Sequence, residues 1–197
     1  MVTKRTNMCK RCDWAFSNEI MIKYHDEEWG VPLHDEQRLF EFFVLEGFQA
    51  GLSWQVVLNK RENFRIAFDY FDPEKVAKYN EKKIAKLVQN KSIIRNKQKI
   101  GACVNNARRF LEIQREFGSF DQYIWGFVNY KPIVNSFQSI KELPPKTPLS
   151  DEISSDLKKR GFKFVGSTVL YAHMQATGMV NDHLVYCYRY KEIQAIY

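Results

Sequence analysis

The stretch DEQRLFEFFVLEGFQAG, residues 35–51, decides the fold, because its apolar side chains point to nearly every side of a helix. A helix that is apolar all round is buried between neighbouring elements and does not lie on the surface. The sequence therefore predicts a buried helix over 35–51, whose apolar positions are Leu39, Phe40, Phe42, Phe43, Leu45 and Phe48.

The chain that follows this stretch has the same helical periodicity. Asp72 and Pro73 together mark a helix start, since aspartate caps a helix and proline suits its first turn. A long helix should carry Ile100, Val104 and Phe110 on one stripe. The expected helices run from 72 through 79, over 81–90, onward from the turn at 91–96, and over 120–129, 150–160 and 165–177.

Other features limit these helices and the fold class. Gly118 and Gly178 are typical helix stops. The stretch 129–148 holds four of the six prolines and is predicted to be an irregular surface crossing. Strand-type alternation is nowhere sustained. We therefore expect an all-α protein folded as one unit.

Composition narrows the class of protein. The 197 residues are 45% hydrophobic and 15% aromatic, which is ample for a core and excludes disorder. No apolar stretch follows the basic N-terminus, so we expect a cytoplasmic protein with no membrane partner. The net charge of +7 favours an anionic partner such as nucleic acid.

The four cysteines are too few for a disulfide scaffold and suit free thiols or metal ligands. His183 and Cys187 are four residues apart, so they lie one turn apart on a helix or close together in a loop. That spacing suits two ligands of one zinc ion, and Cys12 and His25 are candidates for the other two. Simple packing of these side chains is the alternative.

Cys9 and Cys12 also form a C-x-x-C pair, which suggests half of a different metal site or a redox pair. The chain has no second C-x-x-C to complete a four-cysteine site. A redox pair would also be expected at a helix start after a strand, and no strand precedes these residues. Spacing alone leaves the zinc site and these alternatives open.

Glu46 is an acid among phenylalanines and leucines in the buried helix. A buried carboxylate is costly unless something compensates it, so such a residue is a candidate for function. The alternative is a surface glutamate on the one polar edge of the helix.

Several blocks of the chain, running from residue 11 to 187, closely resemble the bacterial 3-methyladenine DNA glycosylase I family. Their order, spacing and content of tryptophan, histidine and glycine are specific to that family. The blocks are RCDW at 11–14, YHDEEWGVP at 24–32, LEG at 45–47 with AGLSW at 50–54, KREN at 60–63, KRGFKFVG at 159–166 and NDH at 181–183.

The resemblance implies a fold and a division of the chain. The family belongs to the helix-hairpin-helix glycosylases, so we expect a helix-hairpin-helix glycosylase-like bundle in a single domain over 1–197. Both termini, about 1–30 and 165–197, would form a zinc-binding lobe, and about 35–164 would form the helical hairpin lobe. The expected protein is a monomer.

The resemblance also implies a ligand set for the metal. In the family, a cysteine and a histidine near the start join a histidine and a cysteine near the end around one zinc ion. The matching residues are Cys12, His25, His183 and Cys187. Four protein ligands leave no place for water, so the zinc would be structural and not hydrolytic. Cys9 would be a spare exposed thiol.

By the same resemblance, the substrate would be alkylated double-stranded DNA carrying 3-methyladenine. Glu46 would lie in the base pocket as the catalytic and base-recognising group, and Tyr24 and Trp54 would stack on the base. Met21 stands where some relatives carry a pocket tyrosine, which predicts a shallower aromatic cage. His34 is expected on the surface, with His173 and Cys103 packed inside.

DNA contacts are implied in three places. The tip Gly51-Leu52 would insert into the duplex, with a core position for Leu52 as the alternative. The hairpin would be 90–99, although it lacks the glycines typical of the superfamily and has no aspartate where most relatives keep a catalytic one after the motif. Its basic residues Arg95, Lys97 and Lys99 would contact phosphates, or would simply be solvated. A second basic cluster comprises Lys158, Lys159, Arg160 and Lys163.

Two other classes of protein remain compatible with these residues. One is a zinc-stapled module that senses alkylated bases in DNA without cutting them, although such a binder has less need for a pocket acid. The other is a hydrolase of free nucleosides, which would not need the basic clusters.

Overall fold

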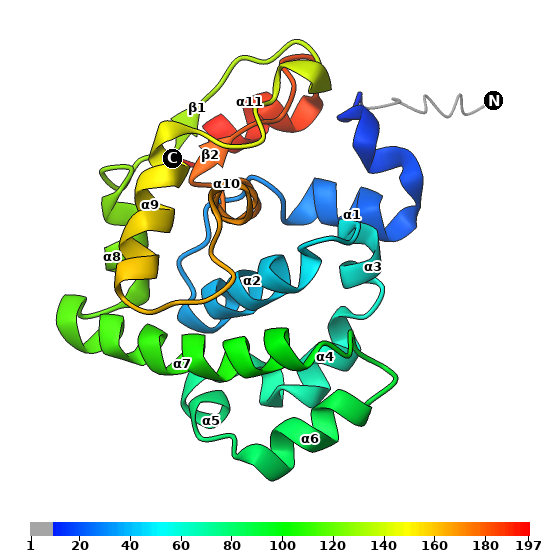
Figure 1. Ribbon diagram of the computed structural model, residues 1–197. Coiled ribbons are helices and arrows are strands. Elements are labelled where there is room, and N and C mark those ends of the chain that lie inside the picture. The colour runs from blue at the N-terminus through cyan, green and yellow to red at the C-terminus, as the bar shows by residue number, and fades with distance from the viewer. Residues whose placement is uncertain (1–9) are drawn as a thin grey trace.

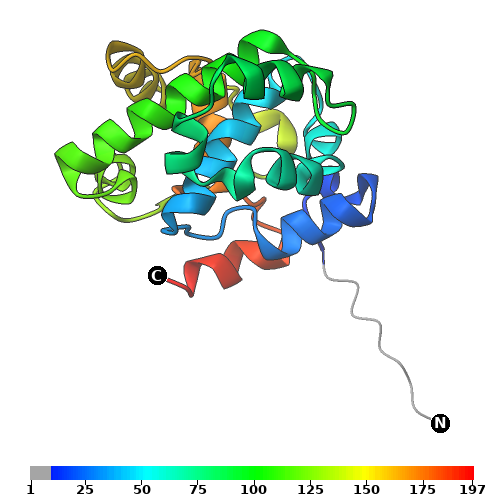
Figure 2. The same ribbon diagram turned by 90° about the horizontal axis from the view of Figure 1, so that it is seen from below.

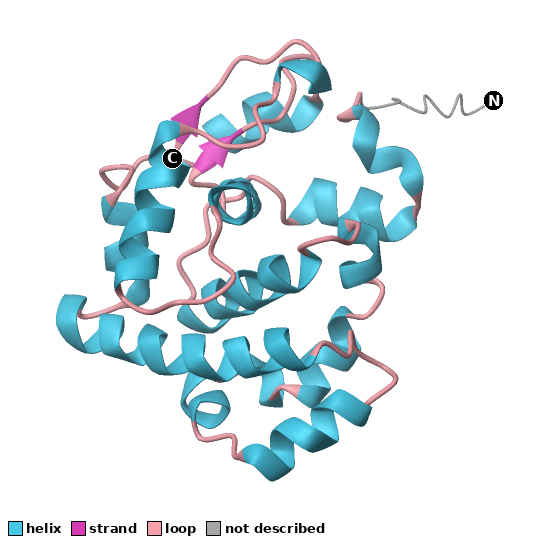
Figure 3. Ribbon diagram, viewed as in Figure 1, coloured by secondary structure: helices cyan, strands magenta, loops and turns pink. Residues whose placement is uncertain are grey.

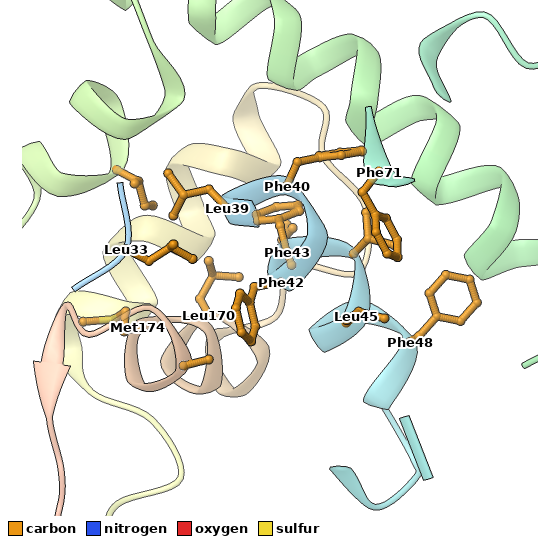
Figure 4. Packing of buried hydrophobic residues seen from close by; sticks show 14 of the residues in the cluster. Leu33, Leu39, Phe40, Phe42, Phe43, Leu45, Phe48, Phe71, Leu170 and Met174 are labelled. Atoms are coloured by element: carbon orange, nitrogen blue, oxygen red, sulfur yellow. The ribbon is translucent and has the colours of Figure 1, made fainter. Parts of the chain in front are cut away.

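Helix α2 (Glu36–Gln49) runs through the middle of the molecule, as Figure 1 shows for the computed structural model, which describes residues 10–197. It begins where Asp35 accepts a hydrogen bond from the Arg38 N–H at 2.9 Å. Leu39, Phe40 and Leu45 are fully buried, and side chains of the helix point to several sides in Figure 4. The predicted all-round burial of this segment is confirmed.

The long helix α7 (Lys97–Phe117) packs across α2 through aromatic rings. Phe40 meets Phe110 with ring centroids 5.1 Å apart, and Phe110 stacks on Phe120 at 4.2 Å. Phe120 opens helix α8 (Phe120–Gly126), so one aromatic cluster ties three helices together. Such ring pairs contribute about 0.5–1.5 kcal/mol each beyond the area they bury.

The expectation of an all-α protein is confirmed in the described residues, where only two strands of two residues interrupt the helices (Figure 3). The predicted helices end within a few residues of the observed ones. The other elements are η1 (Asp13–Ser17), α1 (Glu19–Glu27), α3 (Trp54–Leu58), α4 (Arg61–Ala67), η2 (Asp69–Phe71), α5 (Pro73–Ala77), α6 (Glu81–Gln89), η3 (Ile140–Glu142), α9 (Pro148–Lys159), α10 (Ser167–Ala176) and α11 (Tyr188–Gln194).

The crossing over 129–148 lies on the surface, as predicted, and contains only β1 (Ile133–Val134) and η3. Strand β1 pairs in parallel with β2 (Val180–Asn181), with Ile133 opposite Val180. The pairing continues one residue further, where the Asn135 N–H donates to the Asn181 carbonyl at 3.2 Å. This short pairing fixes the crossing to the chain just before His183.

The N- and C-terminal segments of the described chain lie side by side, with α11 next to α1 in Figure 2. The Tyr188 N–H donates to the Lys10 carbonyl at 2.9 Å, and the Tyr186 hydroxyl donates to Asp13 at 3.0 Å. The expected joining of the N- and C-terminal segments is therefore present in the structure. The boundaries of the two lobes stay a prediction.

A buried ion network joins α1, α2 and α4, and sequence reasoning did not predict it. Arg61 donates to Glu41 at 2.7 Å and to Glu28 at 2.8 Å, and Arg65 also donates to Glu41 at 2.8 Å. The guanidinium groups of Arg65 and Arg61 hold the pKa of Glu41 below its ordinary value, although burial opposes this. Breaking such a network leaves an uncompensated buried charge.

None of the helices within residues 10–197 is both long enough and apolar enough to cross a membrane.

We predict that Gly178→Ala destabilises the fold by about 3 kcal/mol or more. The backbone of Gly178 has φ +74°, and a Cβ there would lie 2.4 Å from the Pro32 nitrogen. Gly101→Ala is the matched control, because its Cβ would meet nothing within 4 Å inside a helix, and we expect a gain of up to about 1 kcal/mol. Urea unfolding of both variants measures the difference, and equal stabilities would contradict the prediction.

Candidate functional site

The structure brings Cys12, His25, His183 and Cys187 into one buried cluster, with all four ligand atoms within 4.8 Å of one another. His25 lies on α1, whereas Cys12 directly precedes η1. His183 and Cys187 lie in the loop between β2 and α11, which decides between the two geometries left open for them. The cluster therefore joins the two ends of the chain.

The spacing within the cluster suits a tetrahedral ion. With metal–sulfur and metal–nitrogen bonds of about 2.3 and 2.0 Å, a sulfur and a nitrogen ligand of a tetrahedral ion lie about 3.5 Å apart. The Cys187 sulfur lies 3.4 Å from His25 Nε2 and 3.5 Å from His183 Nδ1, and the Cys12 sulfur lies 3.7 Å from His183 Nδ1. The donor set is thus able to hold a metal ion.

Each imidazole is oriented by a second partner. His25 Nδ1 is 2.8 Å from Asp26, and Arg11 donates to that carboxylate at 2.7 Å. His183 Nε2 is 3.0 Å from the Trp29 carbonyl. Partners of this kind fix the tautomer of a metal-binding histidine. The hydrogen bond with Cys187 and burial raise the pKa of the Cys12 thiol, and a bound metal ion would favour its thiolate form.

A second site is a pocket of about 300 Å³ between α1, α2, α3, α10 and η3. It brings together the three residues that were expected to form a base pocket, Tyr24, Glu46 and Trp54. Tyr24 and Trp54 have ring centroids 5.5 Å apart and planes tilted by 53°. The other lining residues are Trp14, Met21, Trp29, Gln49, Ile140, Leu143, Ala172 and Gln175.

Glu46 is buried, with 3% of its surface exposed, so the alternative of a surface glutamate is wrong. Its Oε2 atom has no hydrogen-bond partner among residues 10–197. Burial raises the pKa of this carboxyl to about 8. An unpartnered acid in a cavity is costly for folding and is therefore a candidate for ligand recognition.

Sequence reasoning missed part of the pocket wall. Trp14 and Trp29 pack edge to face with centroids 4.9 Å apart, and both line the cavity. Both lie in the blocks that carried the family resemblance, which was the available signal. Ile140 and Leu143 come from the irregular crossing, where no periodicity indicated their direction. Met21 lines the pocket at the expected position.

The residues expected at the DNA surface differ in their positions. Leu52 is 42% exposed, so its alternative as a core residue is wrong. Gly51 is exposed beside it, and Arg95, Lys97 and Lys163 are exposed too. All five residues are therefore accessible to a partner.

Two residues of the basic clusters are not free cations, contrary to expectation. Lys99 is buried, and its ammonium donates to the carbonyls of Phe48 at 2.9 Å and Ala50 at 2.6 Å. These carbonyls lie at the C-terminus of α2, where a helix leaves its last acceptors unpaired and favours a cation. Arg160 donates to Glu116 and Asp156 at 2.7 and 2.8 Å.

The remaining predicted positions are confirmed where the structure describes them. The His34 side chain is 57% exposed, and it lies 2.8 Å from Asp121. His173 and Cys103 are buried, and burial lowers the pKa of His173 to about 4. Cys9, expected as a spare thiol, lies outside the described residues.

The fold and the pocket define a class: a helical protein whose cavity is lined by a buried acid and by aromatic rings, which suits a flat, positively charged ring. Residues 14–190 match the family model described as methyladenine glycosylase. The chain belongs to this family.

Individual members of this family are also similar to the chain. The chain is 49% identical over 178 residues to DNA-3-methyladenine glycosylase 1 of Escherichia coli, covering 90% of this chain and 95% of that one. A crystal structure of 3-methyladenine DNA glycosylase I superposes with a TM-score of 0.88 at 47% identity, covering 91% and 98% of the two chains. A variant of such an enzyme in complex with 3-methyladenine matches with a TM-score of 0.88 at 34% identity, covering 90% and 96%.

We predict that Glu46→Gln changes stability in a pH-dependent way. The folded state holds the Glu46 proton up to about pH 8, whereas the unfolded chain releases it near 4.5. Stability is therefore lost as pH rises from about 4.5 to 8, by a few kcal/mol at about 1.4 kcal/mol per pKa unit. Glutamine does not ionise, so Glu46→Gln lacks this loss. The difference in free energy of unfolding between the variant and the wild type should therefore shift in favour of the variant from pH 5 to pH 9. Urea unfolding at both values checks this, and a constant difference contradicts it.

Proposed function

We propose that this protein is a DNA-3-methyladenine glycosylase that hydrolyses the N-glycosidic bond of 3-methyladenine in alkylated double-stranded DNA and leaves an abasic site. The family membership and the relative in complex with 3-methyladenine support this function. The observation that carries it is the unpartnered Glu46 carboxyl, buried in a cavity beside the rings of Tyr24 and Trp54.

The chemistry of the base explains why this pocket suffices. Methylation at N3 makes the purine cationic, so the base leaves as a neutral molecule and needs little acid catalysis. When the glycosidic bond breaks, its electron pair goes to the base, and water attacks the sugar carbon. A cationic base over the electron-rich rings of Tyr24 and Trp54 gains about 0.5–2 kcal/mol, which ordinary adenine forgoes.

In this proposal, Glu46 recognises the positive charge of the methylated base. A cationic base in the cavity favours the ionised carboxylate, which burial otherwise opposes. The carboxylate then accepts a hydrogen bond from the N–H edge of the base and stabilises positive charge on the sugar in the transition state. Glu46 is therefore both the base-binding and the catalytic residue in this proposal.

The base reaches the pocket by flipping out of the duplex, which costs a few kcal/mol. Leu52 is exposed at the turn that follows α2 and would fill the gap as an apolar wedge beside Gly51. Arg95 in the turn between α6 and α7, Lys97 at the start of α7 and Lys163 on the loop before α10 would contact phosphates. Lys99 supports this surface indirectly, because it ties the start of α7 to the end of α2.

We also propose that the Cys12, His25, His183 and Cys187 cluster holds one structural zinc ion. The Cys₂His₂ donor set and its spacing are those of a closed tetrahedral site. When bound, the ion joins the two chain ends and adds its binding energy to folding. It takes no part in bond cleavage, since four protein ligands leave no position for water.

The decisive experiment incubates the protein with DNA treated with a methylating agent and identifies the released bases. We predict that kcat/KM for 3-methyladenine release rises with pH, reaches half of its maximum near pH 8 and levels off above it, as the free Glu46 carboxyl ionises. Glu46→Gln should lower kcat/KM about a hundredfold and abolish this rise.

The control is Glu112→Gln, because Glu112 is an exposed glutamate on α7. This substitution should leave both the activity and its pH profile unchanged. Binding of methylated DNA without release of any base would identify a damage-sensing module and reject the glycosylase. Wild-type activity in Glu46→Gln would remove Glu46 from the site.

For the metal, we predict one equivalent of zinc in the purified protein and much less in Cys12→Ala and His183→Ala, with a lower melting temperature in both. Cys103→Ala is the matched control, since Cys103 is equally buried but lies on α7, away from the cluster. Elemental analysis measures the content. One full equivalent in both cluster variants would refute the ligand set.

A further inference from the structure

Behind the pocket lies a buried carboxylate, Asp182, which is 1% exposed and belongs to neither the cluster nor the cavity wall. Three side chains donate to it. Tyr171 and Gln175, one turn apart on α10, donate to Oδ2 at 2.6 and 2.7 Å, and Asn135 donates to Oδ1 at 2.6 Å. The pairing of β1 with β2 brings Asn135 to this position.

Gln175 connects this carboxylate with the cavity, because it also lines the pocket that contains Glu46. Its amide has a donor end, Nε2, and an acceptor end, Oε1. Asp182 accepts one of the two N–H groups and so fixes the amide, and the carbonyl, which accepts no hydrogen bond within the described chain, is the acceptor left for a molecule in the pocket. Reversal of the amide would place two acceptor oxygens against each other, so Asp182 holds it in one orientation.

The pocket therefore offers two acceptors to a base, the Glu46 carboxylate and the Gln175 carbonyl. The exocyclic amino group of adenine carries two N–H donors, whereas guanine has a carbonyl oxygen at the same place. We propose that Gln175, positioned by Asp182, is a specificity-determining residue that favours 3-methyladenine over 3-methylguanine. This inference rests on the proposed function.

The strength of such discrimination follows from unpaired polar groups. A site built to hydrogen-bond one substrate rejects an analogue that cannot pair, because buried acceptors then lose water without gaining a partner. An amide free to turn would instead donate to the guanine oxygen and tolerate both bases. The three hydrogen bonds on Asp182 are therefore what makes Gln175 selective.

The test compares two bases released from the same methylated DNA. In Gln175→Met, which keeps length and removes the amide, we expect kcat/KM for 3-methyladenine to fall about tenfold while that for 3-methylguanine changes little. The ratio of the two values should therefore fall about tenfold. Gln49→Met is the control, because Gln49 also lines the pocket but its side chain makes no hydrogen bond within the described chain. Its ratio should match the wild type.

The outcomes separate the inference from the function on which it rests. A wild-type protein that releases no methylated base overturns both. An active wild type with an unchanged ratio in Gln175→Met overturns the inference alone, even if that variant is less stable, because a purely structural role would lower both values together. Gln175→Ala provides a second variant without the amide should the methionine variant fail to fold, and the same ratio decides.

Discussion

The burial of α2 on every side is the constraint on which the rest of the structure depends. Because α7, α8 and α10 all pack against it, its side chains from Leu39 to Phe48 meet protein and not water. Phenylalanines gain free energy from this environment, whereas Glu46 loses its solvation. The same packing that builds the core therefore creates a carboxyl of raised pKa, and the cavity beside it is what allows a ligand to compensate that cost.

The metal cluster and the pocket are coupled through neighbouring residues. Tyr24, in the pocket, directly precedes His25, in the cluster, and Asp182 directly precedes His183. Trp29 contributes its ring to the pocket and its carbonyl to His183. Joining the two chain ends therefore also fixes the pocket wall on α1 and the support behind α10. A structural ion in this protein would thus influence base recognition without taking part in the chemistry.

The helices could be predicted from the sequence because their apolar periodicity and caps are local, as at Asp35 and Pro73. Glu46 could be singled out as an acid among apolar residues, but its grouping with Tyr24 and Trp54 came only through resemblance, since nothing local brings the three together. The errors concern partners far away in the chain. From the sequence, Lys99 and Arg160 are expected to be free cations. In the folded chain Lys99 donates to carbonyls at the end of α2, and Arg160 donates to the Glu116 carboxylate. No periodicity exists in the crossing that carries Asn135, Ile140 and Leu143, so their roles require the folded structure.

The distribution of buried charge shows how the fold separates stability from recognition. The carboxylates of Glu41 and Asp182 are fully supplied with donors and hold helices together. Glu46, on the same helix as Glu41, has an oxygen with no partner in residues 10–197. Since an unsatisfied buried acceptor costs about 1–3 kcal/mol, the well-paired networks around it have to offset that loss. The unpaired acid is tolerable because the carboxylates of Glu41 and Asp182 are paired, and it therefore stays available for a cationic base.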